Sequence, residues 1–238
     1  LNTDNFEEVS FGPILYGAKK LGMHIHTRYE VSNNAGQDIC DIVNNEGFDF
    51  LLVGSGISMS DSPDDIAATR YRTSFYNRYF KRFKAPESWF YPGALLKDKT
   101  KMFIARSNCD VGVFINRNFV KATNTLVVIS SEEDLFLLDY TRTLLKATHG
   151  SVGIVAKMST TTPGHDQILK ELWDFVSSTP QTQLLPDKDL TPGLFNSYNF
   201  MLIGYNTWND VSEHRKEALQ KMPSTLILNK NKRSSSDN

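Results

Sequence analysis

A seven-residue hydrophobic repeat occurs twice in this chain, at residues 48–54 and at residues 198–204. Each copy begins with an aromatic residue, a polar residue and Phe, continues through three apolar residues and ends at a glycine. An unbroken apolar run of this length is typical of a parallel strand whose two faces are both covered. A second apolar run follows each copy after a connection, at 111–115 and at 225–228. The pattern therefore predicts two α/β units in tandem, each ending with a strand, a crossover and a strand.

The remaining pattern fills out these two units. Periodicity predicts strands over 23–31, 124–129 and 152–156 and helices over 13–21, 35–45 and 165–177. The predicted fold class is thus α/β, with two tandem Rossmann-like units and mostly parallel sheets. The first unit, here called the N-terminal lobe, spans residues 1–121, is incomplete at its N-terminus and carries a long insertion at 55–99. The C-terminal lobe spans residues 122–229, and residues 230–238 form a polar tail that we expect to be disordered.

Composition limits the possible partners. The chain has 26 Lys and Arg against 27 Asp and Glu, a net charge of -1 that gives no global attraction to nucleic acid. Its two cysteines, Cys40 and Cys109, are too few for a disulfide framework or a zinc site and fit a reduced compartment. No run of about 18 apolar residues, the length that spans a bilayer, occurs in the sequence. Because the chain opens on Leu1 and its first lobe lacks elements, we expect it to be a piece of a longer protein.

The sequence carries none of the common catalytic motifs, neither a P-loop nor HExxH nor GxSxG, so no catalytic residue is predicted. His24 and His26 would face the same side of a strand, but no third ligand is nearby, so no metal site is predicted. Glu132, Glu133 and Asp134 are consecutive on a predicted helix. Their side chains therefore point in different directions and do not form a catalytic carboxylate pair.

Small polar residues at the carboxyl ends of the predicted strands are candidates for binding an effector. α/β folds place loops that contact phosphate groups at these ends. Gly54 and Gly56, at the end of the first copy of the repeat, are not followed by the third glycine of a dinucleotide fingerprint. The predicted effector site lies around Gly54, Ser55 and Gly56 in the N-terminal lobe or around Ser130, Ser131 and Gly204 in the C-terminal lobe. An adenine nucleotide is the candidate ligand.

The insertion is rich in basic and aromatic residues, and it is a candidate interaction surface. If the segment is helical, its aromatic residues fall on one stripe beside a basic face. The residues of this surface are Arg72, Phe75, Arg78, Tyr79, Arg82 and Phe83. Three readings stay open: docking within the protein or between subunits, contact with a membrane surface, and stacking on nucleic acid. The near-neutral total charge argues against nucleic acid.

Several ordered segments resemble one protein family. They are residues 26–32 (His-Thr-Arg-Tyr-Glu-Val-Ser), the predicted helix around 37–40 (Gln-Asp-Ile-Cys), the strand at 48–54, and residues 101–117, which contain Cys-Asp-Val-Gly-Val-Phe-Ile-Asn-Arg. Together they look like the C-terminal cytosolic region of monovalent cation/proton antiporters. The most similar group contains the plant cation/H+ exchangers and the fungal potassium/proton antiporter of the Golgi. The C-terminal lobe is similar to the family's second lobe, since Gly204 precedes a Trp-containing turn and an acidic helix.

The lobes of this family resemble universal stress protein domains, some of which bind ATP through a glycine pattern after the fourth strand. In this chain Ile57 stands where the second glycine of that pattern belongs, and the insertion breaks the spacing that follows. The resemblance therefore implies the fold and leaves ATP binding open.

The resemblance implies a soluble regulatory or assembly module of a potassium, or other monovalent cation, proton antiporter. Its partners would be the antiporter's own transmembrane domain, a second copy in a homodimer and a membrane surface, with no nucleic acid. Its location would be the cytosolic face of a Golgi or endosomal membrane. The alternative is a stand-alone nucleotide-binding module of the universal stress protein type.

Overall fold

The computed structural model describes residues 11–12, 15–20, 22–28, 32–54, 99–157, 164–186, 190–214 and 221–231. The chain divides into two compact units, an N-terminal segment of residues 1–35 and a main body of residues 36–238. In the N-terminal segment residues 15–20 are helical, whereas residues 22–28 belong to no helix or strand. The strand expected over 23–31 is therefore absent from 23–28, because a strand forms only where a neighbour pairs its backbone groups.

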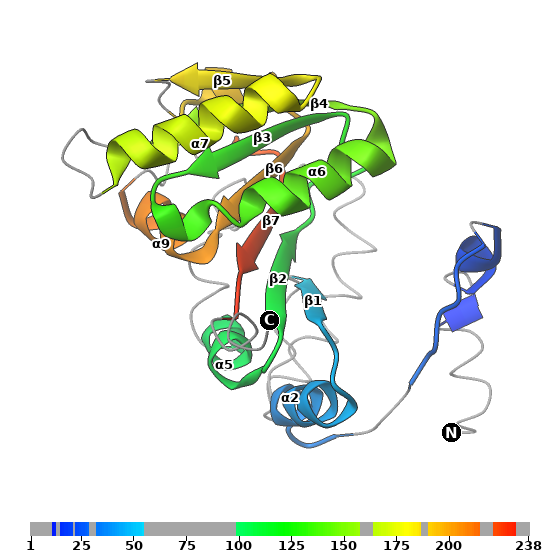
Figure 1. The fold of residues 1–238 in the computed structure, drawn as a ribbon. Coiled ribbons are helices and arrows are strands. Elements are labelled where there is room, and N and C mark those ends of the chain that lie inside the picture. The colour runs from blue at the N-terminus through cyan, green and yellow to red at the C-terminus, as the bar shows by residue number, and fades with distance from the viewer. Residues whose placement is uncertain are drawn as a thin grey trace, which may run out of the picture. The chain divides into compact units, whose positions relative to one another are not determined.

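The main body is built on one seven-stranded sheet with the order β1-β2-β7-β6-β3-β4-β5 (Figure 1). All neighbouring strands are parallel except β2 and β7, which pair antiparallel. The expected α/β class with a mostly parallel sheet is confirmed. The strands are β1 (Phe50–Gly54), β2 (Asp110–Ile115), β3 (Asn124–Ile129), β4 (Ser151–Ala156), β5 (Thr182–Pro186), β6 (Phe200–Gly204) and β7 (Ser224–Asn229).

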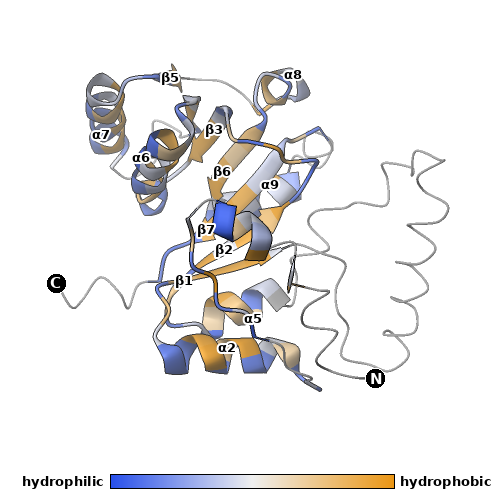
Figure 2. Ribbon diagram, turned by 90° about the vertical axis from the view of Figure 1, so that its right-hand side faces the viewer, coloured by the Kyte–Doolittle hydropathy of each residue, from blue (hydrophilic) through white to orange (hydrophobic). Residues whose placement is uncertain are grey.

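Helices cover both faces of the sheet. They are α2 (Ala35–Glu46), α5 (Lys99–Arg106), the short 3-10 helix η2 (Glu132–Asp134), α6 (Leu137–Thr148), α7 (His165–Ser178), α8 (Pro192–Phe195) and α9 (Tyr205–His214). Apolar residues of α6 and α7 form one core with alternate residues of β3, β4 and β6. Apolar residues of α8 and α9, with Trp208 fully buried, form a second core with the other set of alternate strand residues. The central strands are accordingly drawn largely in orange in Figure 2, as a sheet enclosed between helices requires.

The hydrophobic repeat marks equivalent places in this sheet. Val113 of β2 is paired with Ile227 of β7 at the centre of the antiparallel pair. A local two-fold axis through this pair relates β1, the parallel neighbour of β2, to β6, the parallel neighbour of β7. Strands of both expected lobes therefore share one sheet. The division between residues 121 and 122 stays a prediction.

The two copies of the repeat differ in their surroundings. β6 lies between β7 and β3, and its five residues are all buried. β1 lies at the edge of the sheet, and its residues alternate between exposed and half-buried. The prediction that both faces are covered is thus right for β6 and wrong for β1, whose Phe50 and Leu52 are exposed.

Candidate functional site

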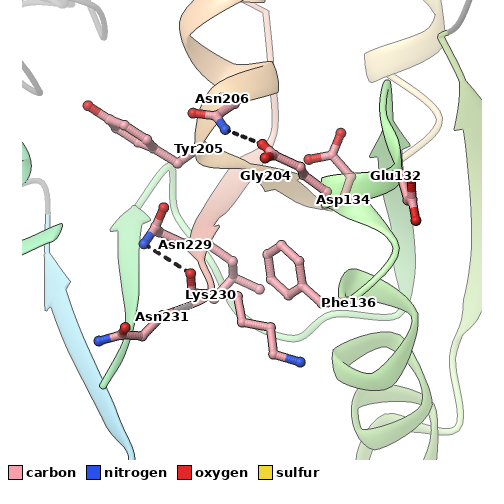
Figure 3. Close-up of a pocket in the computed structure, with 11 residues that line it drawn as sticks. Glu132, Asp134, Phe136, Gly204, Tyr205, Asn206, Asn229, Lys230 and Asn231 are labelled. Atoms are coloured by element: carbon pink, nitrogen blue, oxygen red, sulfur yellow. Dashed lines mark hydrogen bonds between the residues drawn. The ribbon is translucent and has the colours of Figure 1, made fainter. Parts of the chain in front are cut away.

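A crevice of the main body lies at the carboxyl ends of β3, β6 and β7 (Figure 3). Its volume is about 290 Å³. The chain leaves β3 for β4 on one side, and after β5 it returns through α8 to β6 on the other side of β3. Open α/β sheets bind ligands at such topological switch points. The crevice is lined by Glu132, Glu133, Asp134, Phe136, Gly204, Tyr205, Asn206, Leu228, Asn229, Lys230 and Asn231.

Asp134 ties the end of β3 to the start of α9. Its Oδ2 atom accepts hydrogen bonds from the backbone N–H of Ser130 at 2.9 Å and of Ser131 at 3.3 Å. The same oxygen accepts the hydroxyl of Thr207 at 2.6 Å, and Thr207 also contacts the Ser130 hydroxyl. Asp134 is only 2% exposed. The carboxylate therefore occupies amides at the carboxyl end of β3, where an α/β fold would hold a ligand phosphate.

The absence of a side chain at Gly204 leaves space for the carboxylate of Asp134. A Cβ built on Gly204 would collide with Oδ1 of Asp134. The glycine at the end of the second repeat thus permits the close approach of a buried carboxylate to the backbone of β6.

Amide side chains form the wall of the crevice that belongs to α9 and to the end of β7. Asn206 donates to Oε2 of Glu133 at 2.8 Å, which links α9 to η2. Asn229 and Asn231 come from the end of β7, and Lys230 between them is the only cationic side chain among the described residues of the lining. Since Glu132, Glu133 and Asp134 also line the crevice, its net charge is negative and amides supply most of its uncharged polar groups.

Asn231 connects the crevice to β2. Its backbone N–H donates to Oδ1 of Asp110 at 2.8 Å, and its side chain donates to the carbonyl of Ser107 at 2.9 Å. The other Asp110 oxygen accepts the hydroxyl of Tyr140 on α6 at 2.9 Å. Asn231 falls in the tail that we expected to be disordered, yet these bonds hold it against the N-terminal lobe.

Burial and the neighbouring carboxylate change the acidity of two groups here. Burial, and then the hydrogen bond and charge of Asp110, raise the pKa of the Tyr140 phenol. Burial, and then the charge of Asp110, raise the pKa of the Cys109 thiol. Both groups therefore stay protonated at neutral pH, and Tyr140 acts as a hydrogen-bond donor to Asp110.

The structure brings three of the six predicted effector residues together. Gly204 lines the crevice, and Ser130 and Ser131 lie behind it as partners of Asp134. Gly54 ends β1, which is separated from β6 by β2 and β7. Ser55 and Gly56 lie outside the described residues, as do Arg72, Phe75, Arg78, Tyr79, Arg82 and Phe83 of the predicted interaction surface.

Several residues of the crevice were missed by the sequence reasoning. Asp134 was treated only as one of three consecutive acids, although the spacing Ser131-x-x-Asp134 is that of a capping box and signals a side chain folded back on the chain. Thr207, Asn206 and Asn231 carry no recognisable spacing. Each meets its partner only through the order of the strands: Thr207 bonds Asp134, Asn206 bonds Glu133 and Asn231 bonds Asp110. Among the described residues, no group of three or more His, Cys, Asp or Glu side chains is placed to hold a metal ion.

The sheet order, the switch-point crevice and the helices on both faces define a Rossmann-like α/β protein, and its likeness to solved structures shows a universal stress protein-like fold. The chain is similar to the crystal structure of a universal stress protein from Archaeoglobus fulgidus DSM 4304, with a TM-score of 0.54 and 9% identity over 96% of this chain and 78% of that one. It is also similar to a functionally unknown protein from Pseudomonas aeruginosa PAO1, with a TM-score of 0.50 and 9% identity over 94% of this chain and 78% of that one. Identities this low show the fold alone.

No family model matches the sequence, and no curated protein matches it. None of the helices in the described part of the chain combines the length and apolar composition needed to cross a bilayer.

Proposed function

We propose that this chain is the cytosolic regulatory and assembly module of a potassium, or other monovalent cation, proton antiporter of a Golgi or endosomal membrane. The observation that carries the proposal is the segment 101–117, whose sequence resembles that family. In the structure this segment contains most of α5 and the whole of β2. β2 is the strand through which β1 joins the rest of the sheet. The residues of the resemblance thus lie at the junction of the two lobes, where a regulatory module would transmit a change.

The crevice gives this module a way to respond to an effector. A ligand in the crevice would contact Asn231, whose backbone N–H is bound to Asp110 at the start of β2. Binding would therefore change the contacts between the end of β7 and the N-terminal lobe. A module joined to a transporter biases its conformations by the difference in ligand affinity between them. An adenine nucleotide is the ligand that we propose to test first.

The proposed partners follow from the same role. They are the antiporter's transmembrane domain and a second copy of the module, with the membrane surface as a further contact for the segment that contains Arg72 to Phe83. Catalysis is not part of the proposal.

Transport by the full-length protein tests this function. Expressed in a yeast strain without its own potassium/proton antiporters, the full-length protein should restore growth at high potassium. An otherwise identical protein with Asp110→Ala should show altered transport at equal abundance, because Asp110 holds both Asn231 and Tyr140. Lys146→Ala, an exposed change on α6, is the matched control.

The outcome that contradicts the proposal is a natural protein without a membrane domain, or one that carries no cation flux. The alternative, a stand-alone nucleotide-binding module of the universal stress protein type, is favoured by that result if the chain also binds a nucleotide. Its one supporting observation is the fold that the chain shares with the Archaeoglobus protein.

A further inference from the structure

The two copies of the hydrophobic repeat place identical residues in different surroundings. Phe50 and Leu52 of β1 correspond to Phe200 and Leu202 of β6. Phe50 is 36% exposed and Leu52 is 58% exposed, whereas Phe200 is 5% and Leu202 is 2% exposed. Single exposed apolar residues are common on proteins, but a phenylalanine and a leucine on one face of an edge strand form a continuous apolar surface.

The surroundings of β6 show which groups bury these two positions. β6 pairs in parallel with β3 along the edge opposite to β7. Phe200 and Leu202 share a core with Val127 and Ile129 of β3 and with Leu137 and Leu138 of α6. A parallel strand and the helix that follows it therefore supply the cover.

β1 has no such cover in the described part of the chain. Its single strand neighbour there is β2. The outer face of Phe50 meets the ring of Tyr140 at a centroid distance of 6.0 Å, which covers it only in part. The local two-fold axis between β2 and β7 relates β3 and α6 to two positions, one beside β1 and one over Phe50 and Leu52. Within the described residues no strand lies beside β1, and Tyr140 covers Phe50 only in part.

The connectivity of the C-terminal lobe indicates where the missing elements come from. There the covering strand β3 is first in the chain, followed by η2, the covering helix α6, β4, α7, β5 and α8 before β6 begins. Ahead of β1 comes α2, which takes the place of α8. Upstream of α2 the described residues 15–20 are helical and 22–28 contain no strand.

We propose that β1 docks a parallel strand followed by a helix, supplied by polypeptide N-terminal to residue 1 of the same protein. The strand pairs with the outer edge of β1, and the helix packs on Phe50 and Leu52. The paired backbone groups give the contact its register, and the apolar face gives it stability. This inference goes beyond the proposed function, because it holds whether or not the N-terminal polypeptide continues into a membrane.

Cysteine labelling of Leu52→Cys tests the docking directly. The native Cys40 and Cys109 are 1% and 4% exposed, so the introduced thiol dominates the reaction with a maleimide in the folded protein. In the chain of residues 1–238 it should react at the rate of an open thiol. In the full-length protein it should react at least about tenfold more slowly, because the reagent then needs a local opening of the packed strand and helix. Val120→Cys, at a position 93% exposed, should react equally fast in both proteins.

Hydrogen exchange of the wild-type β1 amides provides a second measurement that needs no substitution. Exchange of the β1 amides that face away from β2 should be fast in the chain of residues 1–238 and slow in the full-length protein. The amides of β6 should exchange slowly in both. Slow labelling in the chain of residues 1–238 overturns the proposal, since another part of that chain then covers β1. Protection that rises with concentration assigns the surface to a second copy and also overturns it. Fast labelling in the full-length protein, or a natural protein that begins at residue 1, has the same effect. Antiport activity plays no part in these readouts, so the proposed function and the docking can fail separately.

Discussion

The carboxylate of Asp134 lies directly against the α-carbon of Gly204, with Oδ1 in the space that a side chain at position 204 would need. The carboxylate is held there by backbone amides of the β3 end and by the Thr207 hydroxyl. Gly204, the last residue of the hydrophobic repeat, and Asp134 of η2 therefore pack directly against each other. This contact joins the two strands that flank the switch point.

Gly204→Ala should destabilise the protein by about 1 to 3 kcal/mol, the usual cost of adding a methyl group to a filled site. The bonds that hold Asp134 resist the shift that would make room for the new Cβ. Urea unfolding followed by circular dichroism measures the change.

Gly193→Ala is the matched control for this substitution. Gly193 is exposed on α8, and the nearest atom to an added Cβ is the Thr191 hydroxyl oxygen at 3.9 Å. Its effect should stay within about 0.5 kcal/mol. Equal effects of the two substitutions would show that Asp134 does not restrict position 204.

Asp134→Ala should leave buried donors without an acceptor, at a cost of about 3 kcal/mol. Thr207→Val removes one of these donors and keeps the shape of the side chain, so its cost should be smaller. In a double-mutant cycle the pair should show a coupling of about 1 kcal/mol or more, as expected for directly bonded groups. Urea midpoints of the four proteins give the coupling. Additive effects would contradict the bond, and Glu132→Ala, an exposed neighbour, serves as the unaffected control.

The sequence predicted six of the seven strands of the sheet because their apolar runs are long and end at glycines or turns, but it did not predict β5, whose apolar run is short and ends at Pro186. The burial of β6 followed from its pattern, but the exposure of β1 did not, although Phe50 and Leu52 match Phe200 and Leu202. The difference is made by β3 and α6, which lie elsewhere in the sequence. Identical local patterns therefore predict a strand without predicting its neighbours.

The candidate site was predictable only where its residues follow strands. Gly204 and the serines after β3 could be proposed because parallel strands end at one edge of the sheet. Asp134 takes its role from a bond to Thr207, and Asn231 takes its role from a bond to Asp110. Both hydrogen bonds join segments that are far apart in the sequence, so no local spacing of residues predicts them.

Tyr140→Phe should destabilise the protein by about 1 kcal/mol through loss of the hydrogen bond to Asp110. The pKa of Tyr140 is raised in the folded protein, so its bond is fully present below the ordinary tyrosine pKa of 10.0 and is lost as the pH rises above it. The stability difference between wild type and Tyr140→Phe should therefore be constant from neutral pH to about pH 9 and shrink only in stronger alkali.

Absorbance at 295 nm checks the titration of Tyr140. The difference between wild type and Tyr140→Phe should show one phenol that ionises above the ordinary tyrosine pKa of 10.0. A difference spectrum that appears at the ordinary pKa would mean that Asp110 does not hold the phenol.

ATP and adenosine should stabilise the protein equally if an adenine ligand enters the crevice. Asp134 already occupies the amides at the end of β3, and the lining carries three carboxylates against Lys230. The phosphates of ATP therefore gain few contacts there, and the base and ribose supply the affinity through the amides and aromatic rings. Thermal unfolding at matched ligand concentrations measures this, since a ligand at about 100 times its Kd stabilises by about 2.7 kcal/mol. A larger shift with ATP that Lys230→Ala removes, and that Lys146→Ala on the exposed face of α6 leaves in place, would assign the phosphates to Lys230 and contradict the expectation.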